Sequence, residues 1–189
     1  VIGNCGLGPA PAPNKELTKQ ITIGFKDEWG IDFNWNSFQE YLDSLISKGQ
    51  SLNIAALIPH SAIRLAVMGF EAREPTSQEL EIMKSLVDDA MSAGAIGLAT
   101  GLEYSPGLHA KEDEIIALTK VVSKYGGIYA SHIRQRGDLF ESAVNEALNI
   151  ARASSVQVQL SHLAPRPYAP KNSFDNVLQQ IYTFIDNHG

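Results

Sequence analysis

Two histidines stand at the ends of two neighbouring apolar segments, each as the second member of a Ser-His dipeptide. His132 ends "IYASH" and His162 ends "VQLSH". Adjacent β-strands lie roughly 4.8 Å apart, and Zn–N bonds measure about 2.0–2.1 Å. Two imidazoles at adjacent strand ends can therefore reach one metal ion. The alternative interpretation is that one or both histidines are hydrogen-bonded and only border a pocket.

The single cysteine, Cys5, follows an apolar pair in "VIGNCGLG". Its thiolate could serve as a metal ligand or a nucleophile, and its flanking glycines allow a close approach of backbone. The alternative is a small buried hydrophobic residue. If the segment before Cys5 is a strand of the same sheet, its end faces the same rim as the two histidines. Cys-His-His is a plausible zinc-binding set.

Other residues after predicted strands are weaker candidates for contact with a ligand. His60 could line the rim or hold the following loop by hydrogen bonds, and Tyr104 in "ATGLEYSPG" could hydrogen-bond a substrate or pack in the core. Arg134, two residues after His132, could bind a substrate carboxylate or an acidic side chain of the protein next to the site. Because most Asp and Glu residues fall on predicted helix faces, none is an obvious general base.

The elements that must position these residues alternate along the chain. Capping signals and glycine stops predict helices, and short apolar runs predict strands. Helices are expected at 36–49, 76–94, 110–127, 137–154 and 173–189, and strands at 52–58, 95–100, 128–131 and 156–161, with 1–5 as the end of a further strand. Segment 9–35 shows no regular pattern and is predicted to be a loop between the first strand and its helix, and the prolines that follow "GNCGLG" exclude a helix directly after it.

This alternation, with a period of roughly 30 residues, is typical of β-α units in a parallel sheet. The fold class is therefore α/β. About five β-α units are too few for a closed eight-stranded barrel, so we expect a partial TIM-like (β/α) barrel. Ligands bind such sheets at the carboxyl ends of the strands, which is where Cys5, His132 and His162 are expected.

Composition excludes several classes of partner. The chain has 189 residues and a net charge of −6, which argues against nucleic acid, since such proteins favour a basic surface. No apolar run approaches the roughly 20 residues needed to span a membrane. One cysteine cannot form an internal disulfide, so we expect a reducing, cytoplasmic location. The abrupt first and last segments lead us to expect a piece of a longer chain.

Five segments together resemble a known family. In order they are "GNCGLGPAP", "NIAALIPHSAIR", "GAIGLATGLEYSPG", "GGIYASHIR" and "VQLSH". They are similar to the central part of the D-aminoacylases (N-acyl-D-amino-acid deacylases), zinc-dependent barrel hydrolases of the amidohydrolase superfamily. The resemblance implies that residues 1–189 are the central portion of one (β/α) barrel catalytic domain, with strands missing at both ends. It implies zinc bound by Cys5, His132 and His162, and Tyr104 near the scissile group or the substrate carboxylate.

The resemblance also shows what this chain lacks. The family's His-x-His motif is expected upstream and its general-base aspartate downstream, so no catalytic base is expected within the fragment, and the fragment alone is expected to be inactive. Ala164 stands where the deacylases commonly have a lysine that binds the substrate carboxylate. Arg166 or Lys171 is a candidate to replace it. Arg136 stands where an acidic residue is usual.

Three functions remain open from the sequence. The first is a zinc-dependent hydrolase of small N-acyl-D-amino acids. The second is another hydrolase of the superfamily, acting on a cyclic amide or an isopeptide. The third is a non-catalytic domain that binds small molecules. Because a partial barrel has unpaired strand edges and an exposed apolar interior, we also expect the chain to self-associate or to hold an open, covered arrangement.

Overall fold

A four-stranded parallel sheet organises the chain. The computed structural model describes residues 1–22 and 33–188, so the part of predicted loop 9–35 that covers 23–32 lies outside the described residues. The strands pair in chain order, β1-β2-β3-β4. Their bounds are β1 (Leu57–Pro59), β2 (Gly97–Gly101), β3 (Ile128–His132) and β4 (Gln157–Leu160).

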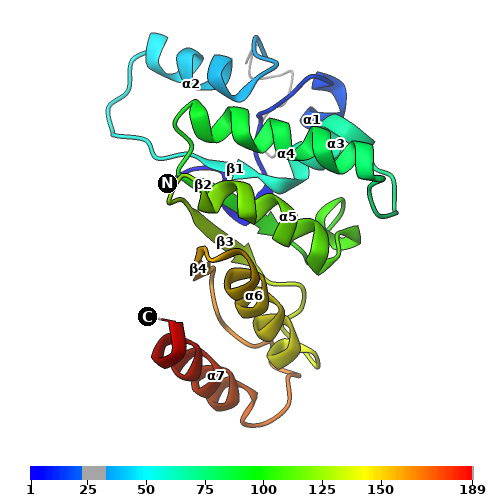
Figure 1. Ribbon diagram of the computed structural model, residues 1–189, viewed down its shortest axis with the longest axis vertical. Helices are drawn as coiled ribbons and strands as arrows, with labels where there is room; N and C mark the ends of the chain where they lie inside the picture. The colour runs from blue at the N-terminus through cyan, green and yellow to red at the C-terminus, as the bar shows by residue number, and fades with distance from the viewer. Residues whose placement is uncertain (23–32, 189) are drawn as a thin grey trace.

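The helices that connect and follow these strands cover one face of the sheet. They are α3 (His60–Met68), α4 (Ser77–Ser92), α5 (Glu112–Ser123), α6 (Phe140–Ser154) and α7 (Ser173–His188). Each helix packs against the next, and Figure 1 shows them in succession along the long axis of the molecule. Right-handed crossovers between strands that pair in chain order place all the helices on the same side. This is the arrangement of a barrel segment.

The N-terminal segment contributes three short elements. They are η1 (Asn4–Gly6), α1 (Lys15–Ile21) and α2 (Phe38–Ser47). In Figure 1, α2 lies at the end of the molecule opposite α7. The predicted start of the helix at 76–94 is confirmed, because Thr76 and Glu79 form a capping box. Ser37 and Glu40 form the same motif before α2.

Side-chain alternation divides the sheet into two faces. Leu98 and Tyr129, which are paired in register, join the large core beneath the helices. Ala99 and Ala130, one residue further along each strand, belong to a small separate cluster on the other face. Because residues two apart on a strand share a face, His132 lies on the same face as Ala130. The face away from the helices therefore carries this cluster, which also includes Leu57 and Ile128, and the predicted ligand His132.

Several predicted elements need correction. The predicted loop 9–35 contains helix α1, which begins after the N-cap Asn14, beyond the last of the prolines. The predicted strand at 52–58 is ordered as a strand only from Leu57. Helix α3 was not predicted, because it follows β1 directly from Pro59 and has no side-chain cap to mark its start. The predicted first strand is an isolated bridge between Ile2 and Ala56, so the sheet has four strands rather than five.

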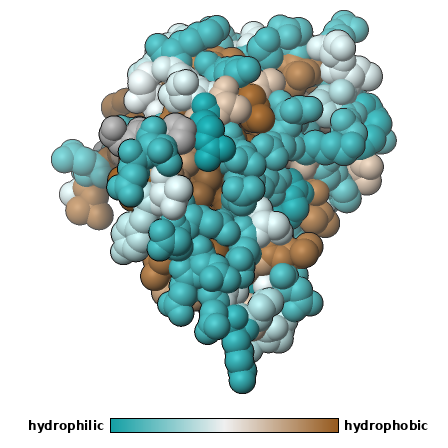
Figure 2. All heavy atoms as spheres, turned by 60° about the horizontal axis from the view of Figure 1, so that its bottom comes forward, coloured by the Kyte–Doolittle hydropathy of each residue, from teal (hydrophilic) through white to brown (hydrophobic). Residues whose placement is uncertain are grey.

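The surface is mixed in character. On the face shown in Figure 2, hydrophilic residues predominate, and hydrophobic side chains are visible in separate groups between them. Large apolar side chains exposed on α7 include Phe174, Tyr182 and Ile185. Within residues 1–22 and 33–188, none of the helices combines the length and the apolar composition that crossing a bilayer requires.

A buried ion network joins α3 to α5. The Nε2 atom of His60 lies 2.8 Å from one carboxylate oxygen of Glu114, and Arg64 donates to the other at 2.5 Å. All three side chains are almost fully buried. Burial alone would raise the pKa of Glu114, but the hydrogen bonds and charges of His60 and Arg64 outweigh it and lower that pKa. The carboxylate therefore stays ionised inside the protein.

Replacing Glu114 with Gln is expected to lower the free energy of unfolding at neutral pH by about 3–5 kcal/mol, because Arg64 would keep a buried charge without its carboxylate. The folded pKa of Glu114 lies below its ordinary value of 4.5. The stabilisation that the Glu114 carboxylate provides is therefore complete at pH values above 4.5. It is lost as the pH falls through the lower pKa that Glu114 has in the folded protein. Denaturant unfolding at a series of pH values measures both effects.

The matched control is Glu81→Gln, which removes an exposed carboxylate paired with Lys84 on α4. It is expected to change stability by no more than about 0.5 kcal/mol. Equal losses in the two variants, or a Glu114→Gln loss that does not shrink in acid, would contradict this account.

Candidate metal centre

Cys5, His132 and His162 converge on one point. One potential ligand atom from each residue lies within 4.8 Å of the others. The Cys5 sulfur and His162 Nε2 are 3.4 Å apart. The two imidazole rings meet edge to face, with centroids 4.3 Å apart and planes 82° apart. The structure thus brings together the three residues that the sequence predicted as metal ligands.

The turn η1 delivers Cys5 to the ends of the strands. Cys5 itself has a positive φ of 57°. A Cβ atom on Gly3 would overlap the carbonyl oxygen of Leu57, and one on Gly6 would overlap the backbone between Thr100 and Gly101. The two glycines therefore let the turn press directly onto β1 and β2, which is the close approach that their presence suggested.

The two histidines are positioned by β3 and by the residues that follow β4. The amide of Ser161 donates to the carbonyl of Ser131 at 2.9 Å, which extends the strand pairing by one residue beyond β4. The Ser161 hydroxyl also lies 3.2 Å from the side-chain oxygen of Asn4. His162 then turns out of the sheet with a φ of 37°. These contacts hold His162 between His132 and Cys5.

The donor set fits a zinc ion. A thiolate and two imidazoles are common zinc ligands, and ligand atoms about 2.0–2.3 Å from a tetrahedral ion lie about 3.5 Å apart. The Cys5–His162 separation matches that value. His132 is only 8% exposed. Its buried Nδ1 atom has no hydrogen-bond partner among the described residues. A bound cation would satisfy this atom.

The electrostatics of the ligands follow from burial. Burial raises the pKa of the Cys5 thiol, opposed by the positive charge of Arg136 and a hydrogen bond with Tyr104. Burial also lowers the pKa of His132, which opposes the effect of its hydrogen bond to Glu103. The neutral imidazole, the form that binds metals, is therefore favoured.

Glu103 is a site residue that sequence reasoning missed. Its carboxylate lies 2.8 Å from His132 Nε2, 2.5 Å from Arg166 and 3.3 Å from Arg136. Burial alone would raise the pKa of Glu103, but these hydrogen bonds and charges lower it to about 2. The available signal was its place beside Tyr104 in the loop after β2, rather than on a helix face.

Tyr104 also lies at the cluster. Its ring meets the His132 ring edge to face at 5.2 Å, and its hydroxyl donates to the carbonyl oxygen of Cys5. Gly101 leaves the space for that hydroxyl, because a Cβ there would overlap it. Burial and the neighbouring Cys5 and Glu103 raise the pKa of Tyr104, so its hydroxyl stays protonated and can donate.

The remaining predicted site residues divide into two groups. Arg166 reaches the cluster through Glu103. Arg134 instead binds the carboxylate of Glu146 and the carbonyls of Leu108 and Ala110, and so fixes the loop after β2. His60 is fully buried against Glu114. The structure does not bring Arg134 or His60 to the metal ligands.

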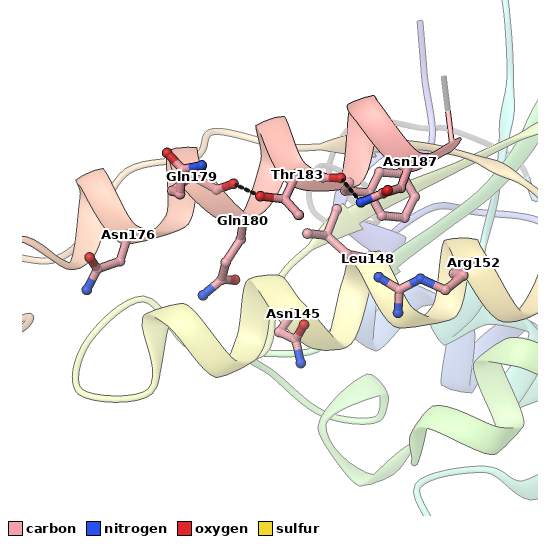
Figure 3. A pocket seen from close by; sticks show the side chains of 9 residues that line it. Asn145, Leu148, Arg152, Asn176, Gln179, Gln180, Thr183 and Asn187 are labelled. Carbon is pink, nitrogen blue, oxygen red and sulfur yellow. Dashed lines mark hydrogen bonds between the residues drawn. The ribbon is translucent and has the colours of Figure 1, made fainter.

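A separate hollow lies between α6 and α7 and has a volume of about 330 Å³. Figure 3 shows that most of its lining side chains are amides. Thr183 and Asn187 hydrogen-bond to carbonyl oxygens of their own helix. The hollow shares no lining residue with the metal cluster and offers no thiol, carboxylate or imidazole.

The chain matches no family model, but it resembles several known proteins. It is 36% identical over 162 residues to the D-aminoacylase of Alcaligenes xylosoxydans xylosoxydans, which covers 86% of this chain and 33% of that protein. A solved D-aminoacylase structure, described in terms of a binuclear metal centre, is 31% identical with a TM-score of 0.82 and covers 97% of this chain and 38% of the other.

A third relative is the N-acyl-D-glutamate deacylase of Bordetella bronchiseptica, solved with zinc and a phosphonate inhibitor that mimics the tetrahedral intermediate. It is 29% identical with a TM-score of 0.82, covering 98% of this chain and 38% of that one. The chain is a partial homologue of the D-aminoacylases and N-acyl-D-amino-acid deacylases of the amidohydrolase superfamily.

This homology confirms the predicted α/β class. The four parallel strands and their helices match a portion of the D-aminoacylase barrel. The chain spans about one third of the length of the curated relatives that it matches.

Proposed function

We propose that residues 1–189 form the central portion of one (β/α) barrel domain in a zinc-dependent amide hydrolase that cleaves small N-acyl-D-amino acids. The convergence of Cys5, His132 and His162 at the strand ends carries this proposal. Homology to D-aminoacylase supports it, as does the zinc bound in a homologous deacylase. A cytoplasmic location stays a prediction from the single cysteine.

The side chains of this site have distinct tasks. Cys5, His132 and His162 would hold the ion, and Glu103 fixes the orientation of the His132 ring through Nε2. When bound, zinc would polarise the amide carbonyl and acidify a water molecule. The Tyr104 hydroxyl, which stays protonated beside His132, can donate a hydrogen bond to a substrate oxygen if it releases the Cys5 carbonyl.

The described residues offer no suitable general base. Glu103 is the nearest carboxylate to the ligands, but its pKa of about 2 makes it a weak base, and both its oxygens already accept hydrogen bonds. Among residues 1–22 and 33–188, no aspartate belongs to the cluster. We infer that this part of the barrel supplies the metal ligands while another part supplies the base.

A second candidate function rests on Ala164. The resemblance to the deacylases leads one to expect a lysine there to bind the substrate carboxylate, and alanine cannot do so. A related hydrolase of the superfamily that acts on a cyclic amide or an isopeptide would not need that lysine. A domain that binds small molecules without catalysis would not need it either. Neutral and acidic substrates therefore have to be compared directly.

The metal site predicts specific losses on mutation. The purified chain is expected to bind one zinc ion, and Cys5→Ala or His162→Ala should each weaken zinc binding by more than about tenfold. Removal of a residue that only hydrogen-bonds to a ligand often costs about that much, so removal of a ligand itself should cost more. The matched control is His109→Ala, a histidine outside the cluster. Elemental analysis and competition with a chelator measure the affinity. Equal zinc affinity in all three variants would contradict the site.

The absence of a base predicts that the chain alone does not turn over substrate. Zinc-loaded protein incubated with N-acetyl-D-amino acids should release no more free amino acid than the Cys5→Ala variant, because nothing at the cluster can carry the water's proton to the leaving amine. Chromatography of the released amino acid measures hydrolysis. Turnover above that control would show that the described residues suffice.

The free side of β4 supports the predicted self-association. Among the described strands, β4 pairs only with β3, and a largely apolar groove of about 860 Å³ lies between β4, α6 and α7. Unpaired edges and apolar grooves favour association, here with a second copy of the chain.

Sedimentation velocity should show an average mass that rises with protein concentration. This rise should be smaller in Ile185→Lys, which places a charge in the groove, than in the control Tyr182→Lys, which changes a residue outside it. A monomer at every concentration would contradict this.

A further inference from the structure

Three charged side chains from three successive loops meet beside the metal ligands. Glu103 follows β2, Arg136 follows β3 and Arg166 follows β4. Arg166 donates to one carboxylate oxygen of Glu103 at 2.5 Å, and Arg136 donates to the other at 3.3 Å. The three loops are thus joined at one carboxylate, on the same edge of the sheet as the zinc ligands.

The backbone also fixes the two arginines relative to each other. The amide of Arg166 donates to the carbonyl of Arg136 at 2.7 Å. The side chain of Gln135 accepts hydrogen bonds from the amides of Gly137 and Leu139, which holds the loop after β3. Gly137 packs so closely on the Tyr168 ring that a Cβ would overlap it. The arginines are therefore placed by ordered loops.

This cluster carries an unbalanced positive charge. Two guanidinium groups share one carboxylate, and that carboxylate also accepts from His132. Within the part of the chain that the structure describes, the buried Nε atom of Arg136 has no hydrogen-bond partner. The side chain of Arg166 is 40% exposed and can reach a ligand. An anion would neutralise the remaining charge and accept the unused N–H groups.

The cluster is close enough to the metal ligands to act on the same small molecule. Glu103 contacts His132 directly, and Arg136 and Arg166 both donate to Glu103. In an N-acyl amino acid, a single carbon separates the amide nitrogen from the carboxylate. The carboxylate of such a substrate therefore lies close to any amide that the metal ligands hold, within the neighbourhood of Glu103 and its two arginines.

We propose that Arg136 and Arg166, bridged by Glu103, form the subsite that binds the carboxylate of an N-acyl amino acid. This deepens the proposed function and rests on it. Arginine binds carboxylates through two parallel hydrogen bonds, which lysine does not provide. The pair supplies the charge that Ala164 does not, and it favours substrates with a free carboxylate over neutral amides.

The test compares two compounds that differ only in that group, N-acetyl-D-alanine and N-acetyl-D-alaninamide. Isothermal titration of the zinc-loaded chain should show tighter binding of the acid. Arg166→Met and Arg136→Met should each weaken acid binding by about tenfold or more, as expected for loss of charged hydrogen bonds, and leave amide binding unchanged. The matched control, Lys124→Met, removes an exposed cation at the C-cap of α5, which has no proposed role in binding, and should change neither.

The two levels of the proposal fail in different ways. If zinc is bound, equal binding of acid and amide would overturn the carboxylate subsite and leave the metal centre intact. Equal weakening of both compounds by Arg166→Met would do the same. Absence of bound zinc in the same samples would instead overturn the metal centre. In that case, titration of the acid and the amide into the metal-free chain still tests the carboxylate subsite, because the charges of the two arginines do not depend on the ion. Circular dichroism of each variant confirms that it is folded.

Discussion

The close contact between the N-terminal turn and the sheet is the constraint on which the site depends. Gly3 and Gly6 press the turn against the backbones of β1 and β2, and the Asn4–Ser161 hydrogen bond ties it to the end of β4. Cys5 can meet His162 only because the turn crosses the strand ends in this way. A side chain at either glycine would push the thiol away, so the proposed metal centre depends on backbone packing.

A second layer of charged groups surrounds the ligands. Glu103 orients His132 and binds two arginines, so one carboxylate links the metal ligands to the proposed substrate-binding residues. Arg134 acts further away, because it fixes the loop that carries Glu103 through the carbonyls of Leu108 and Ala110. These loops follow three successive strands, and parallel pairing brings them to one edge.

The sequence was sufficient for the parts of the structure that depend on local patterns. Alternating β-α units and the two Ser-His dipeptides predicted the parallel sheet and the His132–His162 pair, because the carboxyl ends of neighbouring parallel strands lie together. Helix α3 was missed because no side-chain cap marks its start directly after β1. Glu103 and the partners of Arg134 depend on contacts between residues far apart in the chain, which no local pattern records. The proposed role of Cys5 as a ligand was recognisable mainly through the family resemblance.

The central claim is that one sulfur and two imidazole nitrogens can bind a single ion. X-ray absorption spectroscopy of the zinc-loaded chain measures this coordination directly. The account predicts one sulfur at about 2.3 Å and two nitrogens at about 2.0–2.1 Å in the first shell, and loss of the sulfur contribution in Cys5→Ala. A shell with no sulfur, or one unchanged by that substitution, would contradict it.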